Sequence, residues 1–468
     1  MAGAAQAGTH VKTLGQRDIV LFTVSAILLL DTLAAGATVG PSAVFWWIFL
    51  GLVFFVPYAL ICSEMGTTWP EQGGLYAWIR DAFGRRWASR ATWAYWVNTA
   101  VWMPAIFILF AGIFSQIFVP DLPLAAQIAI GIALTWLAVG INVITLDVGK
   151  WIPNLGAIIK LIVIAAIVGG ALLYTTGHGM ANPLTLQSML PNEGSSLQYM
   201  SVIVYGMLGF ELVSAGSDEM KNPAHDLPRA ILISGLIIIV MYLLATVAIL
   251  AAIPAADINL VEGLVDTLYL FFGETEAGRA FALALGIGAL YTFFANGVTW
   301  ALGCNRAMAE AAAEGEFPAV LARQHRSLGT PTGAAVMLGV VSTVVLLLYG
   351  FLAGSNEDLF WSLFAFSAVI FLLPYIVLVF AFVRMRRLDP ARHRPFRVPG
   401  GDAFATLLAM VCALILALSI LLLVYTPGDG VQWPVLLGAV AVTAIGEVVI
   451  RLTEHRRRAP SGRTSASP

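Results

Sequence analysis

Long apolar runs separated by short polar segments make up most of the chain from residue 18 onwards. A helix that crosses the hydrocarbon core of a bilayer needs about 20 predominantly apolar residues. The runs that meet this length are residues 18–40, 42–65, 90–118, 124–145, 151–175, 199–217, 227–253, 279–309, 332–353, 359–383, 404–425 and 431–450. The pattern therefore predicts an all-α integral membrane protein with 12 transmembrane helices.

Composition agrees with a membrane protein and excludes several other classes. Of the 468 residues, 59% are hydrophobic and only 11% are charged, which leaves too little polar surface for a water-soluble globule of this size. A net charge of −2 disfavours nucleic-acid binding. The three cysteines (Cys62, Cys304 and Cys412) lie far apart in or beside apolar runs, so we expect reduced thiols that serve as packing residues.

Neither enzymatic nor metal-binding motifs are found. The six histidines lie in tails and loops without the spacing of metal ligands, and no catalytic or nucleotide-binding pattern occurs. The polar segments are also too short to hold an ATPase domain. We therefore expect no cofactor, no bound metal and no enzymatic activity, and we expect ion gradients or exchange to supply the energy for any transport.

Basic residues are distributed asymmetrically along the predicted topology. With the N-terminus inside, all but two of the 25 lysines and arginines fall in inner loops and tails, whereas the outer loops are acidic. This asymmetry predicts a cytoplasmic membrane protein with both termini inside. The arginine cluster at residues 384–397 is interpreted first as part of this topology signal, with specific lipid binding as the less favoured reading.

Small residues interrupt the first and the sixth predicted helices at similar places. The first contains Thr32 and Gly36, and the sixth contains Gly206 and Gly209. Matching interruptions in two halves of a transporter indicate an inverted repeat with a binding site near the middle of the membrane. Close helix packing is the alternative explanation for the glycines, but it leaves the nearby acidic residues unexplained.

Three ionisable residues fall near the middle of predicted spans. At 1.5 Å per residue, Asp31 and Glu211 lie about 18 Å and Lys160 about 14 Å from the start of their spans. A charge at the bilayer centre costs about 2.5–3.5 kcal/mol on translocon-insertion scales, so three of them predict a protein-lined, partly hydrated cavity. The alternative is a structural ion pair of Lys160 with Asp31 or Glu211.

Aromatic residues are candidates for the walls and gates of this cavity. Tyr205 precedes Glu211 in the sixth span, Trp300 interrupts a stretch of small residues in the eighth, and the third span carries Tyr95 and Trp102. Aromatic faces bind cations and close pathways. Taken singly, each of these rings is better explained by packing.

Four segments resemble the amino acid-polyamine-organocation superfamily of permeases. They are residues 209–230 in and after the sixth span, the W-P-E-Q-G-G-L-Y-A-W stretch at 69–78 with A-F-G at 82–84, residues 305–318, and R-P-F-R-V-P-G-G at 394–401. The loop segments are most similar to the glutamate:γ-aminobutyrate exchanger branch. Together these segments occur in the expected order along residues 18–450.

The resemblance implies a five-plus-five inverted repeat that works by alternating access on amino acids or amines. It divides the chain into an N-terminal tail (1–17), a transport core of ten helices (18–383), a basic loop (384–403), two further helices (404–450) and a C-terminal tail (451–468). It implies that Glu211 binds amine or couples protons, that Tyr205 and Trp300 gate the site, and that Lys160 places an ammonium in a sodium-like position and couples protons.

One departure bears on the substrate. The exchanger branch typically carries arginine where Asp31 falls, so the reversed charge should disfavour an acidic substrate. With Asp31 and Glu211 against Lys160, the site carries a charge of −1, which suits an amine or a cationic amino acid. The predicted substrate-binding residues are Asp31, Thr32, Gly36, Trp102, Tyr205, Gly206, Gly209, Glu211 and Trp300.

The leading hypothesis is a proton-coupled or exchange transporter for a cationic amino acid or polyamine. The alternative is a neutral amino acid permease, which would hold if Asp31 pairs privately with Lys160. A membrane enzyme, a ligand sensor and a passive channel are all weaker, because the chain has no catalytic constellation or signalling domain and its broken helices suit occlusion. The expected partners are the substrate, protons and the lipid bilayer, and the choice between a monomer and a homodimer stays open.

Overall fold

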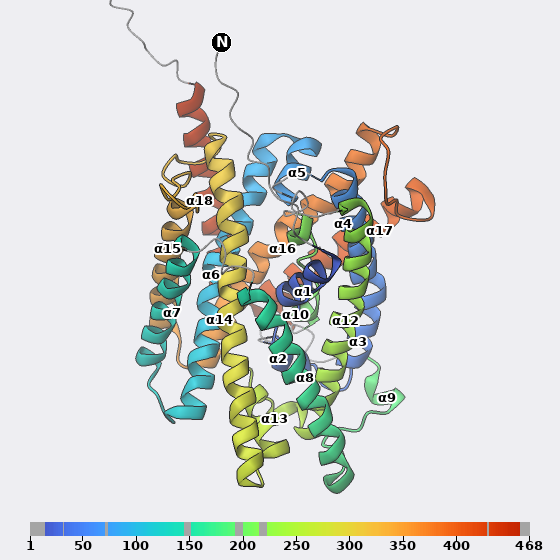
Figure 1. Ribbon diagram of the computed structural model, residues 1–468, viewed down its shortest axis with the longest axis vertical. Helices are drawn as coiled ribbons and strands as arrows, with labels where there is room; N and C mark the ends of the chain where they lie inside the picture. Colours follow the sequence, from blue (N-terminus) through green and yellow to red (C-terminus); the bar gives the residue numbers. More distant parts are fainter. Residues whose placement is uncertain are drawn as a thin grey trace, which may run out of the picture.

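The computed structural model describes residues 15–30, 32–70, 74–144, 151–191, 200–214, 222–427 and 430–458 (Figure 1). Within these ranges, ten helical segments are long and apolar enough to cross a membrane. They are the continuous segment Ala43–Thr68, α6 (Arg85–Phe118), α7 (Leu124–Ile144), α8 (Trp151–His178), α12 (Pro223–Ala252), α14 (Glu276–Ala313), α15 (Thr332–Leu352), α16 (Asn356–Leu388), α17 (Gly401–Val424) and α18 (Trp433–Arg458). Each lies over a predicted span, and the all-α membrane fold is confirmed.

The first predicted span is a broken helix in the structure. Helix α1 (Gln16–Ile27) ends in mid-span, and α2 (Leu33–Ala37) begins after an irregular stretch. Most of the residues on either side of the break are buried. The interruption predicted from the small residues of this span is therefore confirmed.

The sixth span is broken in the same way. It consists of α10 (Met200–Tyr205) and α11 (Glu211–Ser214), separated by residues 206–210. Gly209 has a φ of +128°, a conformation that L-residues with a side chain rarely adopt, so the chain can reverse out of the helix at this position. Glu211 is therefore the first residue after the break.

The second span changes its helical geometry partway along. Helix α3 (Ala43–Leu50) passes through one π-helical turn, η1 (Gly51–Phe55), into α4 (Val56–Thr68). Pro57, at the start of α4, has no backbone N–H and so cannot donate to the preceding turn. The segment stays continuous, and Tyr58 and Glu64 are among the buried polar side chains that it carries into the bundle.

Short elements that the hydropathy pattern did not predict cover the two ends of the bundle. Helix α5 (Leu75–Phe83) lies at one end, whereas α9 (Leu186–Met189) and α13 (Gly263–Phe272) lie at the other (Figure 1). A 3₁₀ turn, η5 (Ala255–Asp257), precedes α13, and a hairpin of two short strands, β1 (Tyr425–Thr426) and β2 (Gly430–Val431), joins α17 to α18. These elements are too short to give a membrane-span signal.

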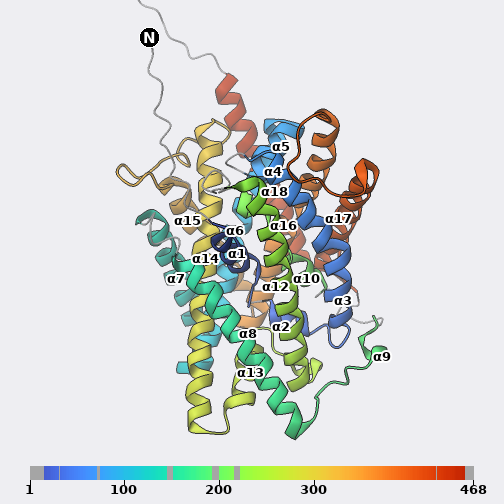
Figure 2. The same cartoon turned by 45° about the vertical axis from the view of Figure 1, so that its right-hand side comes forward.

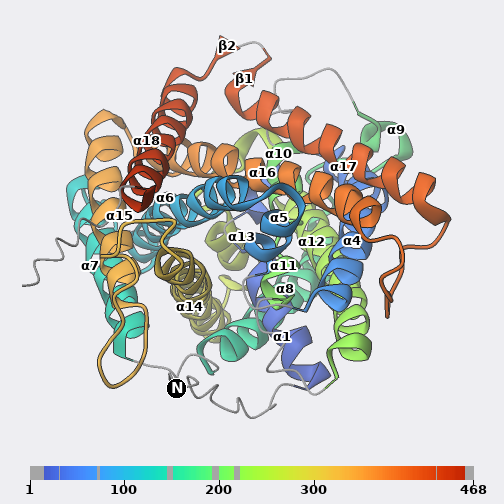
Figure 3. The same cartoon turned by 90° about the horizontal axis from the view of Figure 1, so that it is seen from above.

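The breaks in the first and sixth spans lie among the continuous helices. Helix α8 packs between α12 and α14 (Figure 2), and α6 runs beside α16 across the middle of the molecule (Figure 3). In the most apolar stretch of α6 and in that of α16, 72% of the residues are buried inside the protein, whereas in that of α18 only 22% are buried. Helices α6 and α16 are therefore core elements, whereas α18 faces the lipid.

Candidate functional site

The break in the first span leaves backbone carbonyls without helical partners, and side chains from three other helices bind them. The last carbonyls of any helix lack i+4 donors. The carbonyl oxygens of residues 25, 26 and 27 accept, in that order, from Lys160 Nζ (2.6 Å), Trp300 Nε1 (3.2 Å) and Tyr242 OH (2.7 Å). These donors come from α8, α14 and α12, so the break is held by the helices around it.

Lys160 is completely buried and also donates to Asn296 Oδ1 at 2.7 Å. Its two described acceptors are thus a backbone carbonyl and a neutral amide. The structure places Lys160 beside the first-span break, and its sodium-like position and its role in proton coupling stay predictions. Asp31, one of the two acids considered as an ion-pair partner of Lys160, lies outside the described residues.

Glu211 is 2% exposed and accepts hydrogen bonds from three phenols. Tyr58 OH donates to Oε2 at 2.6 Å, and Tyr375 OH and Tyr95 OH donate to Oε1 at 2.6 and 3.1 Å. The tyrosines come from α4, α16 and α6. A carboxylate offers about four lone-pair positions, so these three neutral donors fix its orientation.

Sequence reasoning missed two of these three tyrosines. Only Tyr95 was considered, as one of several aromatic residues in the third span. Tyr58 and Tyr375 lie inside predicted spans rather than at their ends, whereas membrane tyrosines usually gather at the two interfaces. That unusual depth was the available signal, because a buried phenol O–H usually finds an acceptor.

An aromatic cluster brings together the three predicted site residues Tyr205, Trp300 and Trp102. The centroid of the Trp300 ring lies 5.9 Å from that of Trp102. Phe371 of α16, which was not predicted, links the other rings: its centroid lies 5.1 Å from Tyr205, 5.5 Å from Trp300 and 4.7 Å from Tyr375. These contacts place the predicted gating residues directly beside the tyrosines that hold Glu211.

The small residues of the sixth-span break allow neighbouring side chains to approach closely. A β-carbon at Gly206 would lie 3.2 Å from the Tyr242 hydroxyl, and one at Gly209 would lie 3.0 Å from Ile27 and 3.7 Å from Trp300. Both predicted glycines therefore face the first-span break. Tyr242 was not predicted, although it bonds to that break.

Of the predicted residues of the first span, Thr32 immediately precedes α2 and Gly36 lies within it. Thr32 is buried and donates from Oγ1 to Leu29 O at 3.2 Å. A β-carbon at Gly36 would lie 3.7 Å from the ring of Trp47, which stacks on Tyr242 at 4.5 Å between centroids. The structure thus places both residues in the same layer of the bundle as Tyr242.

The central residues are closed off from solvent. Lys160, Tyr205, Glu211 and Trp300 are each at most 4% exposed. A substrate can reach this layer only after the surrounding elements move apart. The geometry is that of an occluded site, as the broken helices indicated.

A second buried carboxylate lies toward the end of the bundle that carries α5. Glu64 of α4 is fully buried and accepts hydrogen bonds from Nε and Nη2 of Arg386, at 2.8 and 2.5 Å. Arg394 Nε lies 3.2 Å from the same carboxylate, and Val398 N donates to it at 2.7 Å. Part of the arginine cluster interpreted as a topology signal therefore forms a buried ion pair.

The loop motifs that carried the resemblance also meet at this end. Tyr76 donates to Glu316 at 2.7 Å, so the stretch at 69–78 contacts the stretch at 305–318. The Arg394 guanidinium lies 5.8 Å from the centre of the Trp69 ring, which joins the stretch at 394–401 to the first motif. Burial and the Glu316 carboxylate raise the pKa of Tyr76 well above its usual value, so this phenol stays protonated and keeps donating.

Comparisons with known proteins point to one group of membrane transporters. A family model described as amino acid permease matches residues 14–445. A probable agmatine/putrescine antiporter of Lactococcus lactis is 35% identical over 92% of this chain and 93% of its own length. A glutamate/γ-aminobutyrate antiporter of the same organism is 23% identical over 85% and 81% of the two chains, and a probable polyamine transporter of Arabidopsis thaliana is 25% identical over 78% and 72%.

Proposed function

Because the chain belongs to the amino acid permease family and is a membrane transporter rather than an enzyme, we propose that it carries a small amine or a cationic amino acid. Agmatine and putrescine, named for the Lactococcus lactis relative, are the first candidates. Transport proceeds by exchange or with protons, through alternating access at the broken first and sixth spans.

The observation that carries this proposal is the environment of Glu211. The phenols of Tyr58, Tyr95 and Tyr375 orient the carboxylate but, being neutral, do not cancel its charge. A buried carboxylate that keeps its charge is stabilised further by an opposite charge, which neutral donors do not supply. A substrate ammonium that enters this layer gains a charge-assisted hydrogen bond to Glu211.

The aromatic cluster supplies the second half of the site. Rings attract an ammonium to their faces, by about 2 kcal/mol or more when the contact is desolvated. Tyr205, Trp300 and Phe371 lie within one layer beside Glu211. They accommodate the alkyl chain of an amine while their faces contact its charge, and Tyr205 and Trp300 close over it as gates.

Lys160 has a different part in this proposal. Its ammonium holds the first-span break by donating to the carbonyl of residue 25, a place where a bound cation would otherwise neutralise the exposed carbonyls. Loss or gain of its proton would loosen or tighten this break, which links proton movement to the opening of the site. Asp31 remains our predicted second counter-ion for the substrate.

We place the α5 end of the bundle on the cytoplasmic side, together with both termini. The arginines of the loop after α16 and those at the start of α6 gather at this end, in the pattern that orients membrane proteins. The membrane is the cytoplasmic membrane of the cell. A homodimer is compatible with this arrangement but is not needed to complete the site.

Counterflow uptake in proteoliposomes tests the proposal. Vesicles that contain the purified protein are loaded with one unlabelled compound at a time, from putrescine, agmatine, arginine, leucine and glutamate, and accumulation of the labelled compound is followed with and without a pH gradient. We expect accumulation of the amines or of arginine. Accumulation of leucine alone would favour the neutral permease, and accumulation of glutamate alone would overturn the proposal.

A further inference from the structure

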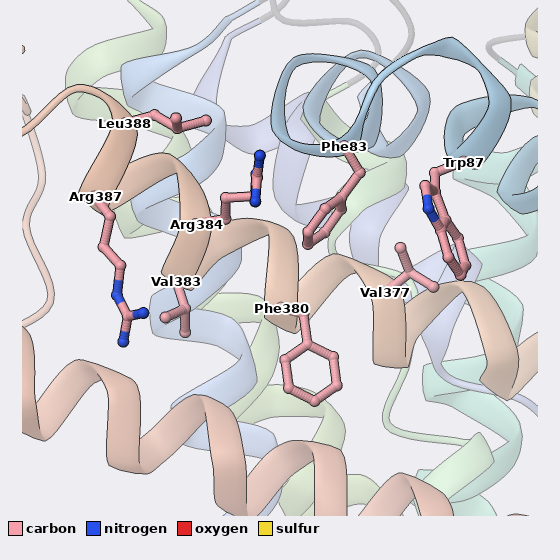
Figure 4. A pocket seen from close by; sticks show the side chains of 8 residues that line it. All are labelled: Phe83, Trp87, Val377, Phe380, Val383, Arg384, Arg387 and Leu388. Atoms are coloured by element: carbon pink, nitrogen blue, oxygen red, sulfur yellow. The ribbon is translucent and has the colours of Figure 1, made fainter.

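An open cavity of about 670 Å³ lies between α5, the start of α6 and the end of α16, away from the transport layer (Figure 4). Its walls combine large apolar side chains with two cations. Phe83 and Trp87 come from the α5–α6 side, and Phe380, Arg384 and Arg387 come from α16. The cavity therefore offers an apolar surface and a basic rim in one place.

The arginines at the end of α16 divide into two groups with different surroundings. Arg386 is buried and holds Glu64. Arg384 and Arg387 are exposed, and in the part of the chain that the structure describes neither has a carboxylate oxygen within 4.0 Å. Arg384 lies with its guanidinium 5.3 Å from the centre of the Phe83 ring, which keeps it at the cavity.

The depth of the cavity matches the boundary between hydrocarbon and headgroups. Helix α16 has 33 residues and is about 50 Å long, which exceeds the roughly 30 Å hydrocarbon core. Its arginines lie in the last two turns, and the exposed ring of Phe380 lies about one turn before Arg384. Trp87, which is 45% exposed, is the kind of residue that gathers at membrane interfaces.

We propose that this cavity binds one anionic phospholipid. The phosphate contacts Arg384 and Arg387, and an acyl chain lies along Phe380 and Trp87. Charge complementarity selects the headgroup: two guanidiniums without a protein carboxylate attract a net negative charge, whereas the cationic group of a zwitterionic lipid would oppose them. The apolar wall selects a lipid over a free anion, since a soluble phosphate gains nothing from exposed rings.

Native mass spectrometry of the delipidated full-length protein tests this site. The protein is titrated with phosphatidylglycerol and, separately, with phosphatidylcholine of the same acyl chains. We expect the wild type to prefer phosphatidylglycerol and Arg384→Gln/Arg387→Gln to lose roughly 30-fold in affinity for it. The matched control Arg323→Gln/Arg326→Gln removes the same charge from the exposed loop after α14 and should bind as the wild type does.

Three outcomes overturn the proposal. Equal affinity of the wild type for the two lipids would identify ordinary annular contact, and this comparison depends on no variant. An unchanged affinity in Arg384→Gln/Arg387→Gln would place the headgroup elsewhere. Displacement of the lipid by millimolar inorganic phosphate would show a simple anion site. Weaker binding of phosphatidylglycerol by Phe380→Ala would, in contrast, support the contact with the acyl chain.

Discussion

Tyr58 and Tyr375 donate hydrogen bonds of 2.6 Å to opposite oxygens of the Glu211 carboxylate, and the centroids of their rings lie 5.8 Å apart. These tyrosines belong to α4 and α16, and the same two helices meet again where Glu64 binds Arg386. Buried carboxylates therefore join α4 and α16 at two depths. The joint at Glu64, toward the α5 end of the bundle, is structural. The joint at Glu211 lies where we propose that the substrate binds.

Replacing Glu211 with glutamine removes the charge with little change of shape. We expect kcat/KM for exchange of a cationic amine to fall about 100-fold, since a hydrogen bond to a charged group contributes about 1.5–3 kcal/mol. Exchange assays in proteoliposomes measure this kcat/KM. The control Glu276→Gln makes the same chemical change at an exposed position and should leave exchange unchanged; a Glu211→Gln protein with at least half of the wild-type rate would contradict the assignment.

Tyr58→Phe and Tyr375→Phe each remove one donor from Glu211 without opening a cavity. Each should lower kcat/KM by about tenfold, because the carboxylate loses part of its orientation and one hydrogen bond of about 1–1.5 kcal/mol. Tyr349→Phe is the matched control, since its hydroxyl donates to Pro434 O far from the site. A loss of the same size in all three variants would show that phenol removal acts on stability alone.

Lys160→Met keeps most of the length of the side chain but removes the ammonium that donates to Ser25 O and Asn296 Oδ1. We expect the protein to lose about 2 kcal/mol or more of stability and to lose uptake. Thermal unfolding in detergent and uptake are measured together. Ser342→Ala removes another buried bond, to Ala100 O, and should lower the unfolding temperature while uptake persists; a Lys160→Met protein that transports normally would remove Lys160 from the mechanism.

Breaking the pair between Glu64 and Arg386 should be more costly than removing a surface charge. Arg386→Met leaves a buried carboxylate with fewer partners, which costs about 3–5 kcal/mol in comparable pairs. The double variant Glu64→Leu/Arg386→Met should recover part of this loss, and Arg326→Met, at an exposed position, should be neutral. Equal unfolding temperatures for Arg386→Met and the wild type would disprove a structural role.

Glu262, just before α13, gives a pH-dependent prediction. Burial, with the charges of Asp266 and Glu357, raises the pKa of Glu262 above its ordinary value of 4.5. The folded protein therefore holds this proton more tightly than the unfolded chain, so the stabilisation is complete below pH 4.5 and is lost as the pH rises through the raised pKa.

Glu262→Gln should accordingly unfold at a higher temperature than the wild type at pH 7.5 and at the same temperature at pH 4. Thermal unfolding at the two pH values measures the difference, and Glu274→Gln, at an exposed position, serves as the control. A stabilisation of equal size at both pH values would point to a cause other than ionisation.

The membrane spans could be predicted because a span is a local property of about 20 residues. The break before Glu211 could be predicted for the same reason, from Gly206 and Gly209. Helices α16 and α18 run past their predicted ends at residues 383 and 450, because ion pairs stabilise their charged last turns. Arg386 binds Glu64 there, and Arg86 binds Glu454.

The partners of the site residues could not be predicted because they come from distant parts of the chain. Tyr58 and Tyr375 are 153 and 164 residues from Glu211 in sequence, and Glu64 is 322 residues from Arg386. The local sequence around each of these side chains does not identify its partner. Only the packing of α4 against α16 gives them a common carboxylate.

The three carbonyls at the end of α1 point to how this helix can move. They are consecutive, so successive acceptors are turned by about 100° around the helix axis, yet their donors Lys160, Trp300 and Tyr242 are fixed on three different helices. A rotation of α1 about its axis would turn all three acceptors away from their donors at the same time. We therefore expect the three bonds to form and break together, so that α1 is either docked against α8, α12 and α14 or released from all of them.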